Sequence, residues 1–153
     1  MTTLSRRSAL GLTLFAPALI LSGRPALARE PEIYSDRGIA IDGSDAVAYF
    51  DGKGPVAGQP AHEVSWKGAT WRFATRDNAD SFAAAPERFA PQFGGYCAFA
   101  ASRGYLAPTI PEAWTVHEGQ LFLNASLRAR ELWLQDVPGN IAKGRQNWPA
   151  ILG

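Results

Sequence analysis

Residues 62–73 read HEVSWKGATWRF, and apolar and polar residues alternate on both sides of the pair Lys67-Gly68. A period of two is typical of half-buried strands, and a two-residue turn that contains glycine joins antiparallel strands into a hairpin. This turn sets the cross-strand pairs Trp66/Ala69, Ser65/Thr70, Val64/Trp71, Glu63/Arg72 and His62/Phe73. We therefore expect His62 at the rim of the apolar face and the charged pair on the other face.

A second hairpin is predicted over residues 114–123, WTVHEGQLFL, with Glu118-Gly119 as its turn. Four apolar residues of this hairpin share one face: Trp114, Val116, Leu121 and Leu123. His117 points the other way, beside the turn, where we expect it to be solvated.

Three helices are predicted outside the hairpins: one that Thr75 caps, one over residues 86–89, and one over residues 125–136 that Pro138 ends. The first helix carries a buried stripe of three residues: Ala79, Phe82 and Ala83. The predicted fold class is α+β, with a small antiparallel sheet of two hairpins packed with several short helices.

The first 28 residues have the layout of an export signal. Arg6 and Arg7 precede an apolar stretch over residues 9–21, and Ala26-Leu27-Ala28 follows as a cleavage site. SRRSAL (residues 5–10) also resembles a twin-arginine signal. Because the apolar stretch is too short to span a bilayer, we expect no stable membrane insertion after cleavage. The expected product is a periplasmic protein with a single domain over residues 29–153.

Charge and sulfur content exclude several function classes. Cleavage after residue 28 would remove three of the 15 basic residues and none of the 14 acidic ones, which leaves a slightly acidic chain. Such a chain has no attraction to nucleic acid or anionic lipid. Cys97 is the one cysteine, so no internal disulfide forms, and Met1 is the one methionine, so a thioether copper site is excluded in the exported form.

Four strings resemble the YHS-domain family, specifically its small exported bacterial branch: DAVAYF (45–50), WKGATWRFAT (66–75), PERFAPQFGGYCAFA (86–100) and PEAWTVHEGQLFLN (111–124). The resemblance covers residues 33–149, and FGGYCA is its most specific part. It implies a small domain of antiparallel strands and helices, often found in proteins that handle heavy metals or assist metal-dependent oxidation. The Tyr-His-Ser string of the family is absent, and Ala74 stands where the metal-linked branch often has a cysteine, so a metal role needs other ligands.

Cys97 is the main candidate site residue, because it follows Gly94, Gly95 and Tyr96, where the backbone can approach a ligand closely. Three interpretations are open: a small buried hydrophobe, a ligand of a metal or cofactor, or a reactive thiol at a helix start. His62 is the candidate second ligand, since imidazole and thiolate together suit zinc or copper. A histidine at the rim of the core that bonds to neighbouring backbone explains His62 equally well.

Two further groups of polar residues have structural explanations. Asp42, Asp45 and Asp51 do not have the spacing of an EF-hand, and turn chemistry accounts for them. Residues 124–126, Asn-Ala-Ser, are formally a glycosylation acceptor, but we expect them to cap the helix that follows.

The leading hypothesis is an exported YHS-type binding module that captures a metal ion, such as copper or zinc, or a small ligand near Cys97. The first alternative is an accessory domain that docks a protein partner and has no site chemistry. The second is a thiol-dependent oxidoreductase. Catalysis is not favoured, because the chain offers isolated reactive residues and no recognisable catalytic constellation. The sequence leaves the oligomeric state open.

Overall fold

The computed structural model describes residues 27–153, so residues 1–26, which hold most of the predicted export signal, lie outside the described part. The predicted α+β class is confirmed, but the two hairpins belong to separate sheets. The larger sheet has the order β1-β2-β4-β3, from β1 (Ser35–Asp36), β2 (Ile39–Ala40), β3 (Gln59–Trp66) and β4 (Ala69–Phe73). In this sheet β2 pairs in parallel with β4, a pairing that the sequence did not predict. The smaller sheet consists of β5 (Trp114–His117) and β6 (Gln120–Leu123).

Within residues 27–153, five helices and four short 3-10 turns complete the fold. The helices are α1 (Arg76–Ala84), α2 (Pro86–Phe89), α3 (Ala98–Arg103), α4 (Leu127–Leu134) and α5 (Val137–Asn147). The 3-10 turns are η1 (Ile41–Gly43), η2 (Ala48–Asp51), η3 (Gln92–Gly95) and η4 (Ala150–Leu152). No helix within residues 27–153 is long and apolar enough to cross a membrane.

The β3–β4 hairpin has the predicted register in four of its five pairs, from Glu63/Arg72 to Trp66/Ala69. The predicted pairing of His62 with Phe73 is wrong, because a bulge lies between Gln59 and Glu63 and Gln59 takes the place opposite Phe73. Pro60 lies inside this bulge, and proline has no N–H to donate to a ladder. His62 is nevertheless half-buried, as expected for the rim of the core face.

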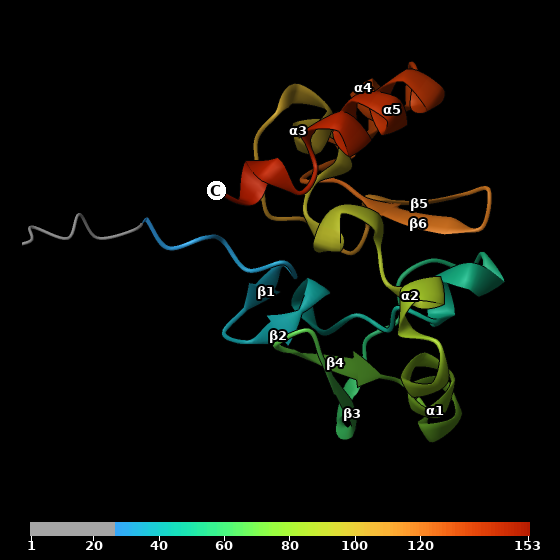
Figure 1. Ribbon diagram of the computed structural model, residues 1–153. Helices are drawn as coiled ribbons and strands as arrows, with labels where there is room; N and C mark the ends of the chain where they lie inside the picture. Colours follow the sequence, from blue (N-terminus) through green and yellow to red (C-terminus); the bar gives the residue numbers. More distant parts are fainter. Residues whose placement is uncertain (1–26) are drawn as a thin grey trace, which may run out of the picture.

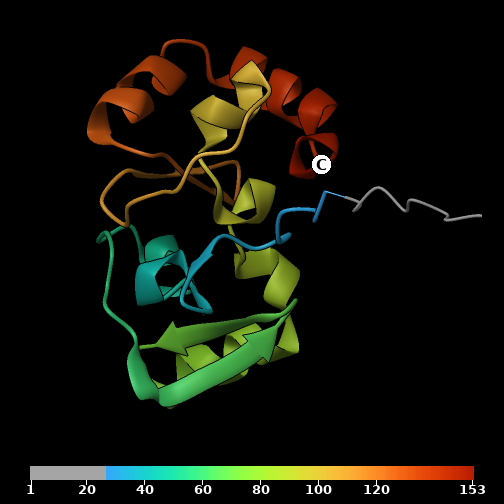
Figure 2. The same ribbon diagram turned by 90° about the vertical axis from the view of Figure 1, so that its left-hand side faces the viewer.

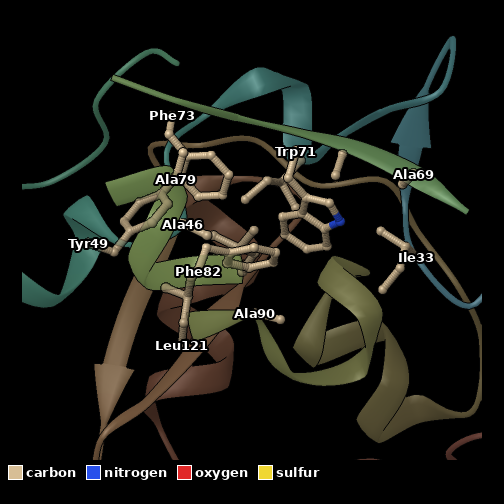
Figure 3. Packing of buried hydrophobic residues seen from close by; sticks show 13 residues of the cluster. Ile33, Ala46, Tyr49, Ala69, Trp71, Phe73, Ala79, Phe82, Ala90 and Leu121 are labelled. Carbon is tan, nitrogen blue, oxygen red and sulfur yellow. The ribbon is translucent and has the colours of Figure 1, made fainter. Parts of the chain in front are cut away.

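The larger sheet packs against α1 through a cluster of aromatic rings. Phe82 of α1 lies 4.9 Å from the Trp71 ring and 5.0 Å from the Phe73 ring, measured between centroids (Figure 3). We call the whole cluster the sheet core: Ile33, Ala40, Ile41, Ala46, Tyr49, Ala69, Trp71, Phe73, Ala79, Phe82, Ala90, Leu121 and Leu123. Thr75 caps α1 as predicted, by accepting from the Asn78 N–H. Ala83, predicted to be buried, is exposed.

The β5–β6 hairpin has the predicted register, but both of its faces are covered. Leu121 and Leu123 belong to the sheet core, whereas Phe122 points the other way into a second cluster. We call this cluster the helix core: Phe93, Ala98, Ala101, Phe122, Trp133 and Ile141. The hairpin lies between the sheet core and the helices α3, α4 and α5 (Figure 1). The prediction of one apolar face was therefore incomplete.

The C-terminal helices differ from the prediction. The helix predicted over residues 125–136 is α4, which is shorter, and Ser126 caps it by accepting from the Ala129 N–H. Pro138 does not end this helix but lies in the first turn of α5, where its missing N–H costs no hydrogen bond. The sequence analysis missed α5, whose segment VPGNIAKGRQN contains two glycines and one proline, all weak helix formers.

Candidate functional site

Cys97 lies in the interior at the start of α3, which agrees with the first of the three open interpretations, a small buried residue. It is 2% exposed, and its Sγ is 3.5 Å from Asn124 Oδ1, which accepts the S–H hydrogen. Its Sγ also accepts from the Ala100 N–H at 3.4 Å and thereby caps the helix. Both sides of the thiol are thus occupied by the protein, which is the arrangement of a structural cysteine.

The diglycine before Cys97 approaches the chain itself rather than a ligand. Gly94 has a φ of +62°, and a Cβ there would overlap the carbonyl oxygen of Glu32. Gly95 has a φ of +85°, and its Cβ would come within 2.7 Å of Ile41 Cγ2. Glycine is required here because the segment 30–35 runs directly against η3, with the Tyr34 N–H donating to Gly94 O at 2.9 Å.

The structure does not bring Cys97 and His62 together. His62 lies on β3 beside Ala79 and Asp80 of α1, in a shallow hollow at the edge of the larger sheet. Cys97 precedes α3, which packs against α5 at the other end of the molecule in both views (Figures 1 and 2). Within residues 27–153 no three side chains of His, Cys, Asp or Glu gather in a group that could hold a metal ion.

The other polar residues singled out in the sequence have structural partners. Asp45 is fully buried, and its carboxylate accepts from three backbone N–H groups, those of Val47, Ala48 and Ala74, and from Asn78 Nδ2. Turn chemistry therefore explains only part of the role of Asp45, because the Asp45 carboxylate also fixes the junction between β4 and α1. His117 is half-buried, with its Nε2 3.8 Å from the neighbouring Glu118 carboxylate, so it is less solvated than predicted.

Asn124 is also fully buried, which makes it inaccessible to glycosylation in the folded chain. Its Oδ1 accepts from the Phe99 N–H at 2.9 Å as well as from Cys97, so it fixes the start of α3. Its Nδ2 has no hydrogen-bond partner among residues 27–153. The expected capping role belongs to Ser126 alone.

A cleft of about 580 Å³ opens beside the segment that carries Cys97. Tyr96, the residue before Cys97, forms part of its wall, and the Cys97 N–H donates to the carbonyl of Ala107, another lining residue. We call it the tyrosine cleft, and its lining residues are Glu30, Pro31, Ile33, Tyr34, Ser35, Tyr96, Gly104, Tyr105, Leu106, Ala107, Pro108 and Ile151. Four separate parts of the chain meet here: the segment 30–35, Tyr96 between η3 and α3, the loop after α3, and the C-terminal turn η4.

Hydrogen bonds hold the walls of the tyrosine cleft in place. Tyr96 Oη donates to Pro31 O at 2.9 Å, and Tyr34 Oη donates to Asp42 Oδ1 at 3.2 Å. The Glu30 N–H donates to Leu152 O at 2.8 Å, which joins the N-terminal segment to η4. In Figure 2 this segment runs beside the C-terminus before it enters the larger sheet.

Burial raises the pKa of both wall tyrosines. For Tyr34 the pKa rises to about 12, because burial and the Asp42 carboxylate, which also accepts its hydroxyl hydrogen, disfavour the phenolate. For Tyr96 the pKa is raised by burial and then by the charge of Glu30. Both hydroxyls therefore stay protonated and keep donating to their protein acceptors at neutral pH.

Tyr96 stands out in the sequence as the neighbour of Cys97, whereas no sequence pattern marks Tyr34, Tyr105 or Glu30 as site residues. These residues lie in loops and short strands without a period or motif, and only the fold brings them together. One signal was present in the sequence, because a tyrosine next to a diglycine marks a place where two segments pass closely.

Comparison with known proteins adds no family to this description. No family model, no curated protein and no solved structure matches the chain. The interpretation of the site therefore rests on its own residues and geometry.

Proposed function

We propose that this chain is an exported YHS-type binding module that captures a small organic ligand in the tyrosine cleft. The observation that carries the proposal is the cleft itself, to which the FGGYCA segment, the part of the sequence most similar to that family, contributes Tyr96. Small-molecule sites in proteins are concave, largely apolar, and on the order of 300–1,000 Å³ in volume. The cleft, at about 580 Å³, has this size.

The composition of the cleft also supports ligand capture. Apolar surface comes from Ile33, Leu106 and Ile151, and three tyrosines provide aromatic surface. Glu30 and Ser35 add a carboxylate and a hydroxyl. A few polar groups within an apolar surface give a ligand orientation as well as affinity.

The placement of Cys97 argues for the cleft and against thiol chemistry. Its sulfur is buried and bonded on two sides, so a substrate or metal ion would reach it only after α3 had moved. The role that we assign to Cys97 is to fix the start of α3 and, through its N–H, the Ala107 wall of the cleft. We expect that a thiol reagent added to the native protein leaves Cys97 unmodified, and that Cys97 reacts once the protein is unfolded.

Export to the periplasm is part of this proposal and rests on the sequence pattern of residues 5–28. N-terminal mass analysis of the protein from the periplasm is the direct test, and a chain that begins at Arg29 is the expected result. Retention of the apolar stretch would contradict it.

The experiment that tests ligand capture is a binding screen with a pair of matched variants. A library of small organic molecules is screened by ligand-observed NMR against the wild type, Leu106→Trp and Leu134→Trp. Leu106 lines the cleft, so tryptophan there fills the cleft, whereas Leu134 lies exposed on α4. We expect compounds that bind the wild type and Leu134→Trp but not Leu106→Trp. Equal binding to all three proteins, or no binding to any, would overturn the proposal.

Metal titration separates this proposal from the metal hypothesis. Zinc and copper are titrated into the wild type, Cys97→Ser and His62→Ala. We expect no stoichiometric binding that depends on both residues, because they lie on separate parts of the fold. One equivalent of metal lost in both variants would restore the Cys97–His62 site and contradict our assignment of Cys97 to a structural role.

A further inference from the structure

The wall of the tyrosine cleft presents two aromatic rings at an angle to each other. The ring centroids of Tyr34 and Tyr96 are 5.7 Å apart, and their planes are tilted by 57°. Tyr105, which is 54% exposed, adds a third ring at the rim. Because both wall hydroxyls donate to protein acceptors, a ligand meets the rings rather than free hydroxyl hydrogens. The half-buried ring of Tyr34 offers more of this surface than that of Tyr96, which is 8% exposed and packs against it.

The charges around these rings are negative. Glu30 lines the cleft, and its charge acts on Tyr96, whereas Asp42 and Asp36 act on Tyr34. None of the described residues that line the cleft is basic. The nearby Arg103 lies over the ring of Phe99, 4.9 Å from its centroid, so that its guanidinium already has an aromatic partner.

From this geometry we infer that the ligand of the tyrosine cleft is an organic cation of the methylated-ammonium class, held by the rings of Tyr34, Tyr96 and Tyr105 and by the carboxylate of Glu30. This inference rests on the proposed function, since it names the ligand class of the same site. The electron-rich faces of aromatic rings attract cations, and methylated ammonium groups are the ligands that such rings typically recognise.

Other ligand classes fit the cleft less well. An anion would meet Glu30 and no lining residue of opposite charge. A calcium or magnesium ion needs six or more oxygen ligands, whereas the lining offers a single carboxylate. A methylated ammonium ion needs no basic residue and no set of six oxygen ligands, because its charge is spread over methyl groups that pack against the rings.

The test compares choline with its uncharged isostere, 3,3-dimethylbutan-1-ol, by calorimetric titration of the purified protein. The two probes have the same shape and hydroxyl group and differ in the quaternary nitrogen. We expect choline to bind about threefold to thirtyfold more tightly, which corresponds to the usual range of cation–π free energies. Two exposed positions allow substitution without risk to the core: Tyr105 and Glu30.

Substitutions at Tyr105 and Glu30 test which residues make choline bind more tightly than the alcohol. Tyr105→Leu is expected to weaken choline binding about threefold or more, whereas Tyr105→Phe keeps the ring and retains the affinity. Glu30→Gln should weaken choline and leave the alcohol unchanged. Glu118→Gln, which removes the same charge at the β5–β6 turn, should change neither.

The outcomes distinguish this inference from the proposed function. Equal affinity for choline and the alcohol, with both lost in Leu106→Trp, would overturn the cation inference and leave ligand capture standing. Choline binding that is absent, or unaffected by Leu106→Trp, would also overturn the inference, and the library screen then decides the proposed function by itself. A choline preference that Glu30→Gln and Tyr105→Leu both reduce supports the inference.

Discussion

The sheet core and the tyrosine cleft both contain aromatic rings, but they differ in what covers these rings. In the sheet core, Trp71, Phe73 and Phe82 are at most 1% exposed, and each ring packs on another ring. In the tyrosine cleft, Tyr34 and Tyr96 have their hydroxyls bonded to the protein, and exposure increases from Tyr96, which is 8% exposed, through the half-buried Tyr34 to Tyr105, which is 54% exposed.

The difference shows that aromatic residues have two separate roles in this fold. Rings whose surface is fully covered contribute to folding, because burial removes their apolar area from water. Rings that are fixed at one end and line a hollow are available to a ligand. We therefore expect changes in the sheet core to alter stability and changes in the cleft rim to alter binding. The predictions below test this separation.

The largest expected loss of stability is for Trp71→Ala in the sheet core. Removing a buried tryptophan should lower the free energy of unfolding by about 3 to 5 kcal/mol. The matched control is the adjacent Arg72→Ala, which breaks the surface pair with Glu63 and should cost less than about 1 kcal/mol. Urea denaturation measures both. Equal losses at the two positions would mean that the ring cluster is not the main support of the sheet.

Asp45→Ala should cost about 3 kcal/mol, because it leaves three buried backbone N–H groups and Asn78 Nδ2 without an acceptor. Asp51→Ala is the matched control, since the exposed Asp51 carboxylate accepts from the Lys53 N–H in a turn. It should cost less than about 1 kcal/mol. Denaturant titration of both variants gives the comparison, and a small loss for Asp45→Ala would show that water replaces the carboxylate.

The titration of Tyr49, a residue of the sheet core, should make the stability of the fold depend on pH in the alkaline range. Burial raises the pKa of Tyr49 to about 12, against an ordinary value of 10.0. The protonated Tyr49 hydroxyl stabilises the fold fully at pH values below the pKa of Tyr49 in the unfolded chain. This stabilisation is lost as pH rises through the higher pKa of Tyr49 in the folded chain. Between about pH 9 and about pH 11, Tyr49→Phe should therefore lose about 1 kcal/mol less stability than the wild type does. Urea melts at the two pH values measure the difference, and parallel losses would show that Tyr49 does not titrate with unfolding.

Tyr105→Leu should have the smallest effect on stability, within about 0.5 kcal/mol, because the side chain is mainly exposed. In the same protein the affinity for cleft ligands should fall. Thermal denaturation and calorimetric titration of one preparation give both numbers. A clear loss of stability with unchanged affinity would assign Tyr105 to folding and contradict the separation of the two clusters.

The hairpin and α1 residues of the sheet core could be predicted from the sequence because their determinants are local, whereas Ile33, Ala40 and Tyr49 join this core through contacts that no local pattern indicates. Alternation and an x-Gly turn defined both hairpins, and Thr75 marked the start of α1. The errors came from residues that act at a distance or against local preference. Pro60 lies in a bulge, so that Phe73 pairs with Gln59 instead of His62. Pro138 lies in the first turn of α5, a helix that its two glycines make hard to predict from the sequence. Phe122 is buried because the hairpin lies between two clusters, which no pattern within the hairpin reveals.

The candidate site was less predictable because it has no local pattern. Its residues come from four parts of the chain, and the contacts that join them, such as Tyr96 Oη with Pro31 O, span many residues. The glycines of the FGGYCA segment marked a close approach correctly, but the partner is the segment 30–35 of the same chain. Cys97, the one cysteine, was the main candidate site residue in the sequence, whereas the neighbouring Tyr96 is the residue that lines the cleft.

The measurement that tests the central claim most directly is amide chemical-shift mapping of the isotopically labelled protein with compounds that bind in the library screen. The account predicts shifts in the residues that line the tyrosine cleft, including Tyr34, Tyr96 and Tyr105, and no shifts at His62 on the edge of the larger sheet. Shifts that gather at His62, on α4, or anywhere else away from the cleft would contradict the assignment of the tyrosine cleft as the ligand site.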